Sequence, residues 1–191
     1  MNLPNTLSII RVFLVPLFVA SLLFMRDIKI WGYVVPAIIY IITGLTDMLD
    51  GKIARKYNLV TDFGKFIDPL ADKFMVLSSM IAILVWMILL GKVTLALVFV
   101  WVVLVILLRE LGVTSLRLVV AGKSGIVVAA RMLGKIKTVS QMVGTVVIIL
   151  EPLFWSGSIA SYVFMAIMAF TTLFSGLDYL KAYLPHIDSN K

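Results

Sequence analysis

The sequence contains no cysteine, one histidine and few charged residues, and each shortage excludes a class of protein. Without cysteine, the chain forms no disulfide and offers no thiolate ligand to a metal ion. Only 14% of its 191 residues are charged and 62% are hydrophobic, which excludes a water-soluble domain of this size. The first residues lack a basic stretch followed by a small-residue cleavage site, so we expect no removable signal peptide. The lone histidine, His186, lies in a polar tail and is expected to be solvated.

Long hydrophobic runs take the place of the missing charges. Crossing a bilayer takes about 20 apolar residues in a helix, and a helix satisfies the backbone groups that lipid cannot. We therefore predict an all-α integral membrane protein in which residues 1–191 form a single domain. A short interfacial helix within residues 1–11 should precede six transmembrane helices, at about residues 12–25, 30–46, 68–90, 93–108, 126–150 and 158–180. The fourth helix is expected to continue past Arg109 to about Ala121.

The basic residues predict how the chain is oriented in the membrane. Six spans place both termini on the same side. If that side is the cytoplasm, 14 of the 17 Lys and Arg residues are cytoplasmic, and only Arg26, Lys29 and Lys92 lie opposite. The positive-inside rule therefore predicts cytoplasmic termini. The net charge of +7 follows from this orientation, and we expect no nucleic acid partner.

The acidic residues are concentrated in one stretch, residues 47–72, which holds five of the ten. Asp47 and Asp50 are three residues apart and Asp68 and Asp72 are four apart, so each pair should lie on one face of a helix. Four carboxylates brought together repel one another unless a cation neutralises them. Because the stretch has no histidine or cysteine, its oxygen ligands favour Mg²⁺, Mn²⁺ or Ca²⁺ over zinc. Two ions suit four carboxylates, as in sites of phosphoryl displacement.

Two glycines and two basic segments accompany the acidic stretch. Gly51 and Gly64 are expected to interrupt the helices around it, and Arg55, one turn beyond Gly51, is placed to clamp a phosphate. The basic segment 109–137 is expected to bind the phosphate of a soluble substrate. Membrane orientation alone is an equally good explanation for single residues of that segment, and a better one for Lys52, Lys56, Lys65 and Lys73.

The acidic motif carries a resemblance to a known family. The pattern Asp47-x-x-Asp50-Gly51-x-x-Ala54-Arg55, then eight residues, then Gly64-x-x-x-Asp68-x-x-x-Asp72, resembles the signature of the CDP-alcohol phosphotransferases in every fixed position. The six-span pattern agrees with that family along the whole chain. Within the family, the opening MNLPNTLSIIR and the later RELGVTSLRLVVAGKSG and GKIKTVSQM look like the bacterial phosphatidylglycerophosphate synthases.

The resemblance implies a reaction, its location and its residues. The phosphatidyl group of CDP-diacylglycerol would pass to sn-glycerol 3-phosphate, with release of CMP, at the cytosolic face of the bacterial inner membrane. Two Mg²⁺ or Mn²⁺ ions would be held by Asp47, Asp50, Asp68 and Asp72, and Asp72 would also be the general base. The CDP group would contact Thr46, Gly51, Ala54, Arg55 and Gly64. The candidates for the acceptor phosphate are Arg109, Arg117, Lys135 and Lys137, with Asn5 and Arg11 as further candidates. Members of the family are commonly homodimers, so a second copy of the chain is the expected protein partner.

Two other functions stay open at the level of sequence. Another acceptor, such as inositol phosphate or serine, would use the same chemistry. A divalent-cation transporter would use the acidic stretch as an ion pathway, but transporters commonly have internal repeats and a site at the midplane. Here the acidic residues gather at one end of the predicted spans, and the chain has no internal repeat.

Overall fold

The computed structural model describes residues 2–57, 61–124 and 132–183, and every regular element in these ranges is a helix. The helices are α1 (Leu3–Phe24), α2 (Trp31–Lys56), α3 (Asp62–Leu89), α4 (Val93–Ser124), α5 (Met132–Phe154) and α6 (Ile159–Tyr183). Each is long and apolar enough to cross a membrane. The predicted all-α architecture with six membrane-spanning helices is therefore confirmed for the described residues.

The separate interfacial helix predicted near the N-terminus is wrong, because residues 3–11 are the first turns of α1. Asn2 is the N-cap, and its side-chain oxygen accepts a hydrogen bond from the Asn5 N–H at 3.3 Å. Pro4 follows in the first turn, where its missing N–H removes no helical hydrogen bond. With this cap and no glycine before Phe24, the helix continues directly into the apolar span.

The two glycines of the acidic stretch do not interrupt its helices, contrary to expectation. α2 continues through Gly51 to its end at Lys56, so the aspartates that precede Gly51 belong to one unbroken helix. Gly64 lies in the first turn of α3, and its N–H donates to the hydroxyl of the N-cap residue Thr61 at 3.0 Å. Each carboxylate pair therefore keeps true helical spacing.

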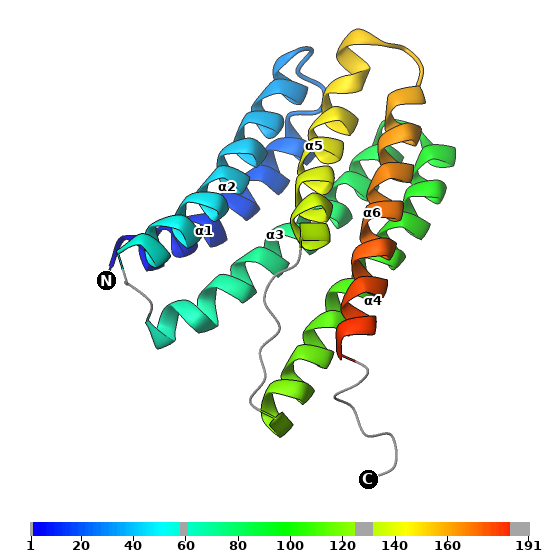
Figure 1. The fold of residues 1–191 in the computed structure, drawn as a ribbon. Coiled ribbons are helices and arrows are strands. Elements are labelled where there is room, and N and C mark those ends of the chain that lie inside the picture. Colours follow the sequence, from blue (N-terminus) through cyan, green and yellow to red (C-terminus); the bar gives the residue numbers. More distant parts are fainter. Residues whose placement is uncertain (1, 58–60, 125–131, 184–191) are drawn as a thin grey trace.

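The helices form two groups of three that pack against each other (Figure 1). α1 packs against α2 and α3, and α6 packs against α4 and α5. Contacts between α2 and α5 and between α3 and α4 join the groups. The start of α1, the end of α2, the start of α3 and the ends of α4 and α6 lie toward one end of the bundle (Figure 1). α4 extends past Arg109 to Ser124, as predicted, which brings its basic residues to this end.

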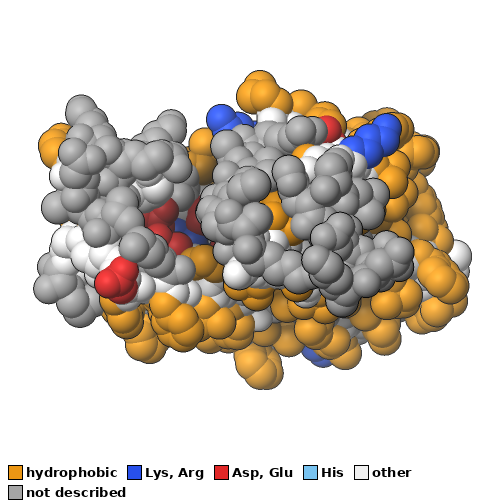
Figure 2. Space-filling view, turned by 60° about the horizontal axis from the view of Figure 1, so that its bottom comes forward, with side chains coloured by type: hydrophobic (Ala, Val, Ile, Leu, Met, Phe, Trp, Pro, Cys, Tyr) orange, Lys and Arg blue, Asp and Glu red, His pale blue; other side chains and the backbone are white. Residues whose placement is uncertain are grey.

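A buried apolar core holds the two groups together, and apolar side chains also cover the outside. The largest core side chains, each at most 1% exposed, include Trp86, Phe99, Ile106, Ile148 and Met168. Hydrophobic side chains dominate the sides of the molecule in Figure 2, as expected for a surface in contact with lipid. More than half of each of Phe13, Phe24, Trp101, Leu108 and Phe154 is exposed.

Glu151 joins α5 to α6 at the other end of the bundle. Its buried carboxylate accepts hydrogen bonds from the N–H groups of Ala160 (2.7 Å) and Ser161 (2.9 Å) and from the Ser161 hydroxyl. These N–H groups belong to the first turn of α6, where a helix has no backbone partners of its own.

We predict that Glu151→Ala lowers the free energy of unfolding by about 2 kcal/mol, because it leaves buried donors without an acceptor. Glu151→Gln keeps one side-chain acceptor and should lose less. Thermal unfolding in detergent should therefore give midpoints in the order wild type, Glu151→Gln, Glu151→Ala. Equal midpoints for wild type and Glu151→Ala would contradict the capping role.

Candidate active site

One face of α1 is polar yet buried, near the start of the helix. Asn5, Ser8 and Arg11 follow one another at intervals of three residues and so share this face. They are 6%, 0% and 0% exposed, respectively. An arginine buried this completely needs carboxylate partners, and α2 supplies them.

Arg11 binds both aspartates of α2. Its Nη1 lies 2.5 Å from Asp47 Oδ1, and its Nη2 pairs with Asp50 Oδ2. The Asp50 side chain is 6% exposed, whereas that of Asp47 is 35% exposed and reaches toward the surface. Because one guanidinium binds both carboxylates, the prediction that Asp47 and Asp50 share a helix face is confirmed.

Ser8 links the aspartates of α2 to those of α3. Its Oγ lies 2.5 Å from Asp68 Oδ1 and 3.3 Å from Asp50 Oδ2. The hydroxyl has one proton and donates to one carboxylate at a time. Asp50 of α2 and Asp68 of α3 thus lie within hydrogen-bond distance of a single hydroxyl group, which brings one carboxylate of each helix close together.

Asn5 fixes the start of α3 against α1. Its Nδ2 donates to Thr61 Oγ1 at 3.0 Å, and the Thr61 hydroxyl lies 3.1 Å from Asn5 Oδ1. A Cβ at Gly64 would lie only 2.9 Å from Asn5 Oδ1, so the side chain of Asn5 takes the space that a larger residue would need. Asn5 and Gly64, predicted to contact different substrates, are therefore neighbours here.

Asp47, Asp50, Asp68 and Asp72 form what we call the acidic cluster, and their donor atoms fit a hard divalent cation. All the side-chain ligands are oxygen atoms, and the cluster already attracts a cation, because Arg11 binds two of its members. Among the described residues, no three acidic side chains converge as a metal site would require. The guanidinium thus supplies the positive charge in this arrangement.

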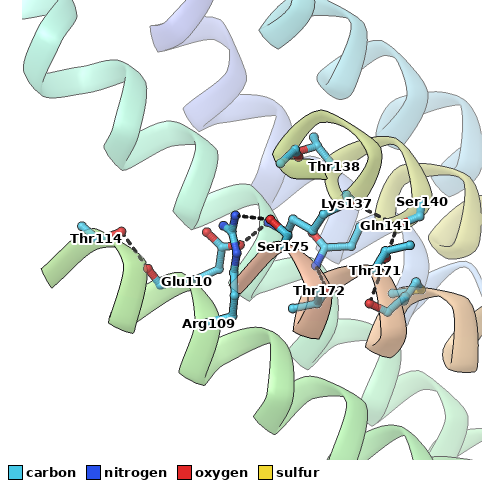
Figure 3. Close-up of polar contacts among 12 residues, drawn as sticks. Arg109, Glu110, Thr114, Lys137, Thr138, Ser140, Gln141, Thr171, Thr172 and Ser175 are labelled. Atoms are coloured by element: carbon cyan, nitrogen blue, oxygen red, sulfur yellow. Dashed lines mark hydrogen bonds and ion pairs between the residues drawn. The ribbon is translucent and has the colours of Figure 1, made fainter. Parts of the chain in front are cut away.

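Arg109, Glu110 and Lys137 lie between α4, α5 and α6 (Figure 3). Together with Arg117, an exposed residue of α4, they form what we call the basic cluster. Lys137 is 5% exposed and its Nζ pairs with Glu110 Oε1. The same oxygen accepts from Arg109 Nη1 at 3.2 Å. Glu110 therefore holds one cation from its own helix and one from α5.

Side chains of α6 orient the two arginines. Arg109 Nη2 donates to Ser175 Oγ at 2.7 Å (Figure 3). The buried ring of Tyr179 lies 5.3 Å from the Arg109 guanidinium carbon and 5.9 Å from that of Arg117. Distances below about 6 Å allow cation–π attraction. Arg109 and Arg117, eight residues apart on α4, thus meet at one ring.

The other predicted acceptor residues lie elsewhere. Lys135 is exposed, and residues two apart on a helix do not face each other, so it points away from the buried Lys137. Asn5 and Arg11 lie with the acidic cluster. The side chains of Lys123 and Arg131, in the basic segment, fall outside the described part of the structure, as does His186.

The predicted CDP contacts are partly described. Thr46 precedes the acidic cluster on α2, is half-buried, and donates its hydroxyl proton to the Thr43 carbonyl at 2.7 Å. Gly51 follows the cluster on the same helix. The side chains of Ala54 and Arg55 lie outside the described part of the structure.

Asp72 lies where the two clusters meet. It is half-buried on α3, one turn after Asp68. Its charge interacts with Asp47 of the acidic cluster and with Lys137 and Glu110 of the basic cluster. Acidic side chains are visible in a recess at this end of the molecule (Figure 2). Asp72 is therefore coupled electrostatically both to the oxygen ligands of the acidic cluster and to the charged groups of the basic cluster.

Several residues of the site were missed at the level of sequence. They are Ser8, Thr61, Glu110, Ser175 and Tyr179. Ser8 had a usable signal, because it stands midway between Asn5 and Arg11 on one helical face. Ser175 and Tyr179 had no usable signal in the sequence, because polar and aromatic residues are common in membrane-spanning helices.

Comparison with known proteins agrees with this arrangement. The family model described as CDP-alcohol phosphatidyltransferase matches residues 1–174. A CDP-diacylglycerol–glycerol-3-phosphate 3-phosphatidyltransferase of Bacillus subtilis is 40% identical, with 93% of both chains covered. A protein of Pseudomonas fluorescens with the same name is 33% identical over 100% of this chain and 94% of its own. A probable phosphatidylglycerophosphate synthase of Mycobacterium tuberculosis is 36% identical over 97% of this chain and 83% of its own. With a matching model over most of its length, relatives of this similarity and the acidic motif on two helices that both pack on α1, the chain belongs to the CDP-alcohol phosphatidyltransferase family.

Proposed function

We propose that the protein is a phosphatidylglycerophosphate synthase, which transfers the phosphatidyl group of CDP-diacylglycerol to sn-glycerol 3-phosphate and releases CMP. The observation that supports this best is that the charges of Asp47 in the acidic cluster and of Lys137 and Glu110 in the basic cluster all act on Asp72. A diphosphate lipid and a phosphorylated acceptor would meet at such a junction. The names of the full-length relatives from Bacillus subtilis and Pseudomonas fluorescens support the same reaction.

The acidic cluster is the proposed metal site. The family uses a divalent metal, and the four aspartates of the cluster would hold it, as two ions of Mg²⁺ or Mn²⁺. Bound there, such ions would supply the positive charge that stabilises the oxygens of a phosphoryl displacement. Beside the cluster, Thr46, Gly51, Ala54, Arg55 and Gly64 remain the proposed contacts of the CDP group.

Asp72 is the proposed general base. The glycerol hydroxyl attacks the β-phosphorus of CDP-diacylglycerol, a new P–O bond forms, and the bond to the CMP oxygen breaks. The hydroxyl proton passes to the Asp72 carboxylate. Because the charge of Lys137, a residue proposed to hold the acceptor phosphate, acts on Asp72, an acceptor held there would bring its hydroxyl toward this base.

The charge of the basic cluster favours a phosphorylated acceptor. Arg109, Arg117 and Lys137 contribute three positive charges and Glu110 one negative charge, which leaves two positive charges. A phosphate monoester carries about 1.5 to 2 negative charges near pH 7, whereas serine has no net charge. Exposed Lys135 is proposed to attract the acceptor from water, and Asn5 and Arg11 to contact it from α1.

Orientation and assembly complete the proposal. The protein is a multi-pass membrane protein, proposed to lie in the bacterial inner membrane with both termini and the active site facing the cytosol. The distribution of Lys and Arg supports this orientation. A homodimer is proposed from the family resemblance.

A panel of acceptors tests the proposed function directly. Purified protein with CDP-diacylglycerol and Mg²⁺ or Mn²⁺ should release CMP rapidly with sn-glycerol 3-phosphate. Release should be at least about tenfold slower with serine or glycerol, which lack the phosphate that the basic cluster would bind. Inositol phosphate is the sharpest competitor, because it shares that phosphate. Preference for any other acceptor in the panel would reject the proposed substrate.

Asp72→Asn should abolish proton transfer and leave lipid binding largely intact. We predict a fall in kcat of about 10² to 10⁴, the range for loss of a general base, with metal-dependent binding of CDP-diacylglycerol retained. Asp27→Asn is the matched control, because Asp27 is 81% exposed and lies in the turn after α1. Full CMP release by Asp72→Asn would remove Asp72 from this role.

Arg117→Ala should weaken acceptor binding selectively. Because the guanidinium belongs to the basic cluster, we predict a higher KM for glycerol phosphate and little change in the KM for CDP-diacylglycerol. Lys181→Ala removes an exposed cation of α6 and should leave both KM values unchanged. If Arg117→Ala raised both KM values equally, the acceptor would have to bind elsewhere.

A further inference from the structure

Arg11 occupies an unusual position for a residue proposed to contact the acceptor. It is fully buried, and its two ion pairs use carboxylates that are also proposed metal ligands. Its Nε–H is buried as well and has no hydrogen-bond partner among the described residues. Leaving such a donor unpaired costs free energy, so the ion pairs hold the side chain in a position that does not satisfy it completely.

A divalent cation and the Arg11 guanidinium compete for the same atoms. Asp47 Oδ1 and Asp50 Oδ2 already accept from Arg11. Two cations placed against these oxygens would repel each other strongly in a partly buried site. The hydroxyl of Ser8 is uncharged and can stay between Asp50 and Asp68 with or without a bound divalent cation.

We infer that Arg11 is an internal counter-ion of the acidic cluster, which a divalent metal ion displaces. Without metal, the guanidinium neutralises the aspartates of α2 and keeps α1 packed against them. With metal, Arg11 leaves both carboxylates, and its positive charge becomes available to a substrate phosphate. The Arg11 side chain would then have two states. Without metal it pairs with the aspartates of the acidic cluster, and with metal it contacts the acceptor. The inference rests on the proposed role of Asp47 and Asp50 as metal ligands.

Binding of Mn²⁺ alone, measured by electron paramagnetic resonance on the purified full-length protein, tests the competition. A neighbouring unit charge changes the affinity of a carboxylate for a cation such as the proton by about ten- to a thousandfold. We therefore expect Arg11→Gln to bind Mn²⁺ about tenfold more tightly than wild type. Arg11→Lys keeps the charge and should stay close to wild type. Arg26→Gln removes an arginine at the other end of α1, where it pairs with exposed Asp27, and should have no effect.

Thermal unfolding separates competition from a purely structural role. Arg11→Gln should unfold at a lower temperature than wild type without metal, because its aspartates then repel one another. Saturating Mn²⁺ should raise its midpoint more than that of wild type. A purely structural role for Arg11 predicts weaker Mn²⁺ binding together with lower stability. Unchanged or weaker Mn²⁺ binding by Arg11→Gln would overturn the inference.

Wild-type protein provides a second measurement that needs no variant. Phenylglyoxal modifies accessible arginines, and peptide mass spectrometry gives the rate at each residue. Modification of Arg11 should be slow without metal and accelerate when Mn²⁺ is added, while Arg26 reacts at one rate throughout. A rate at Arg11 that Mn²⁺ leaves unchanged or lowers would contradict displacement. Failure of wild type to bind Mn²⁺ at all would instead reject the proposed metal ligands, and with them the proposed function.

Discussion

Charge neutralisation inside an apolar bundle is the constraint on which this site depends. Buried charges are stable only when opposite charges lie beside them. Arg11 is paired with Asp47 and Asp50, and Lys137 is paired with Glu110. Each pair joins two helices, α1 with α2 in the first case and α4 with α5 in the second. The charges that would serve the reaction therefore also help to position the helices that carry them.

The first helix matters to the site as much as the acidic motif does. α1 contributes a buried polar face that reaches Thr61 at the start of α3, Asp68 about two turns further on, and both aspartates of α2. The motif residues are separated along the chain by the junction between α2 and α3. α1 spans that separation with hydrogen bonds and ion pairs, so the spacing of the carboxylates depends on a helix outside the motif.

Much of this architecture is predictable from sequence, because the responsible forces are local. Apolar runs define the spans, and intervals of three or four residues place Asp47 with Asp50 on one helix face. The ends of the helices were harder to predict than the spans. Gly51 lies inside α2, because packing on α1 and α5 holds that helix together. Contacts between segments far apart in the sequence were the hardest feature to predict. Nothing in the order of residues indicates that Arg11 turns to the aspartates, or that Tyr179 meets the arginines of α4.

Internal pairing also explains how two oppositely charged clusters can lie side by side without merging. If Lys137 and the arginines of α4 were unpaired, they would attract the aspartates of α2 and α3, and neither a metal ion nor a phosphate could bind well. Glu110 pairs with Arg109 and Lys137, and Arg11 pairs with Asp47 and Asp50. Asp72 interacts with charges of both clusters. In the proposed reaction, a carboxylate coupled to both clusters would take the proton that leaves the attacking hydroxyl.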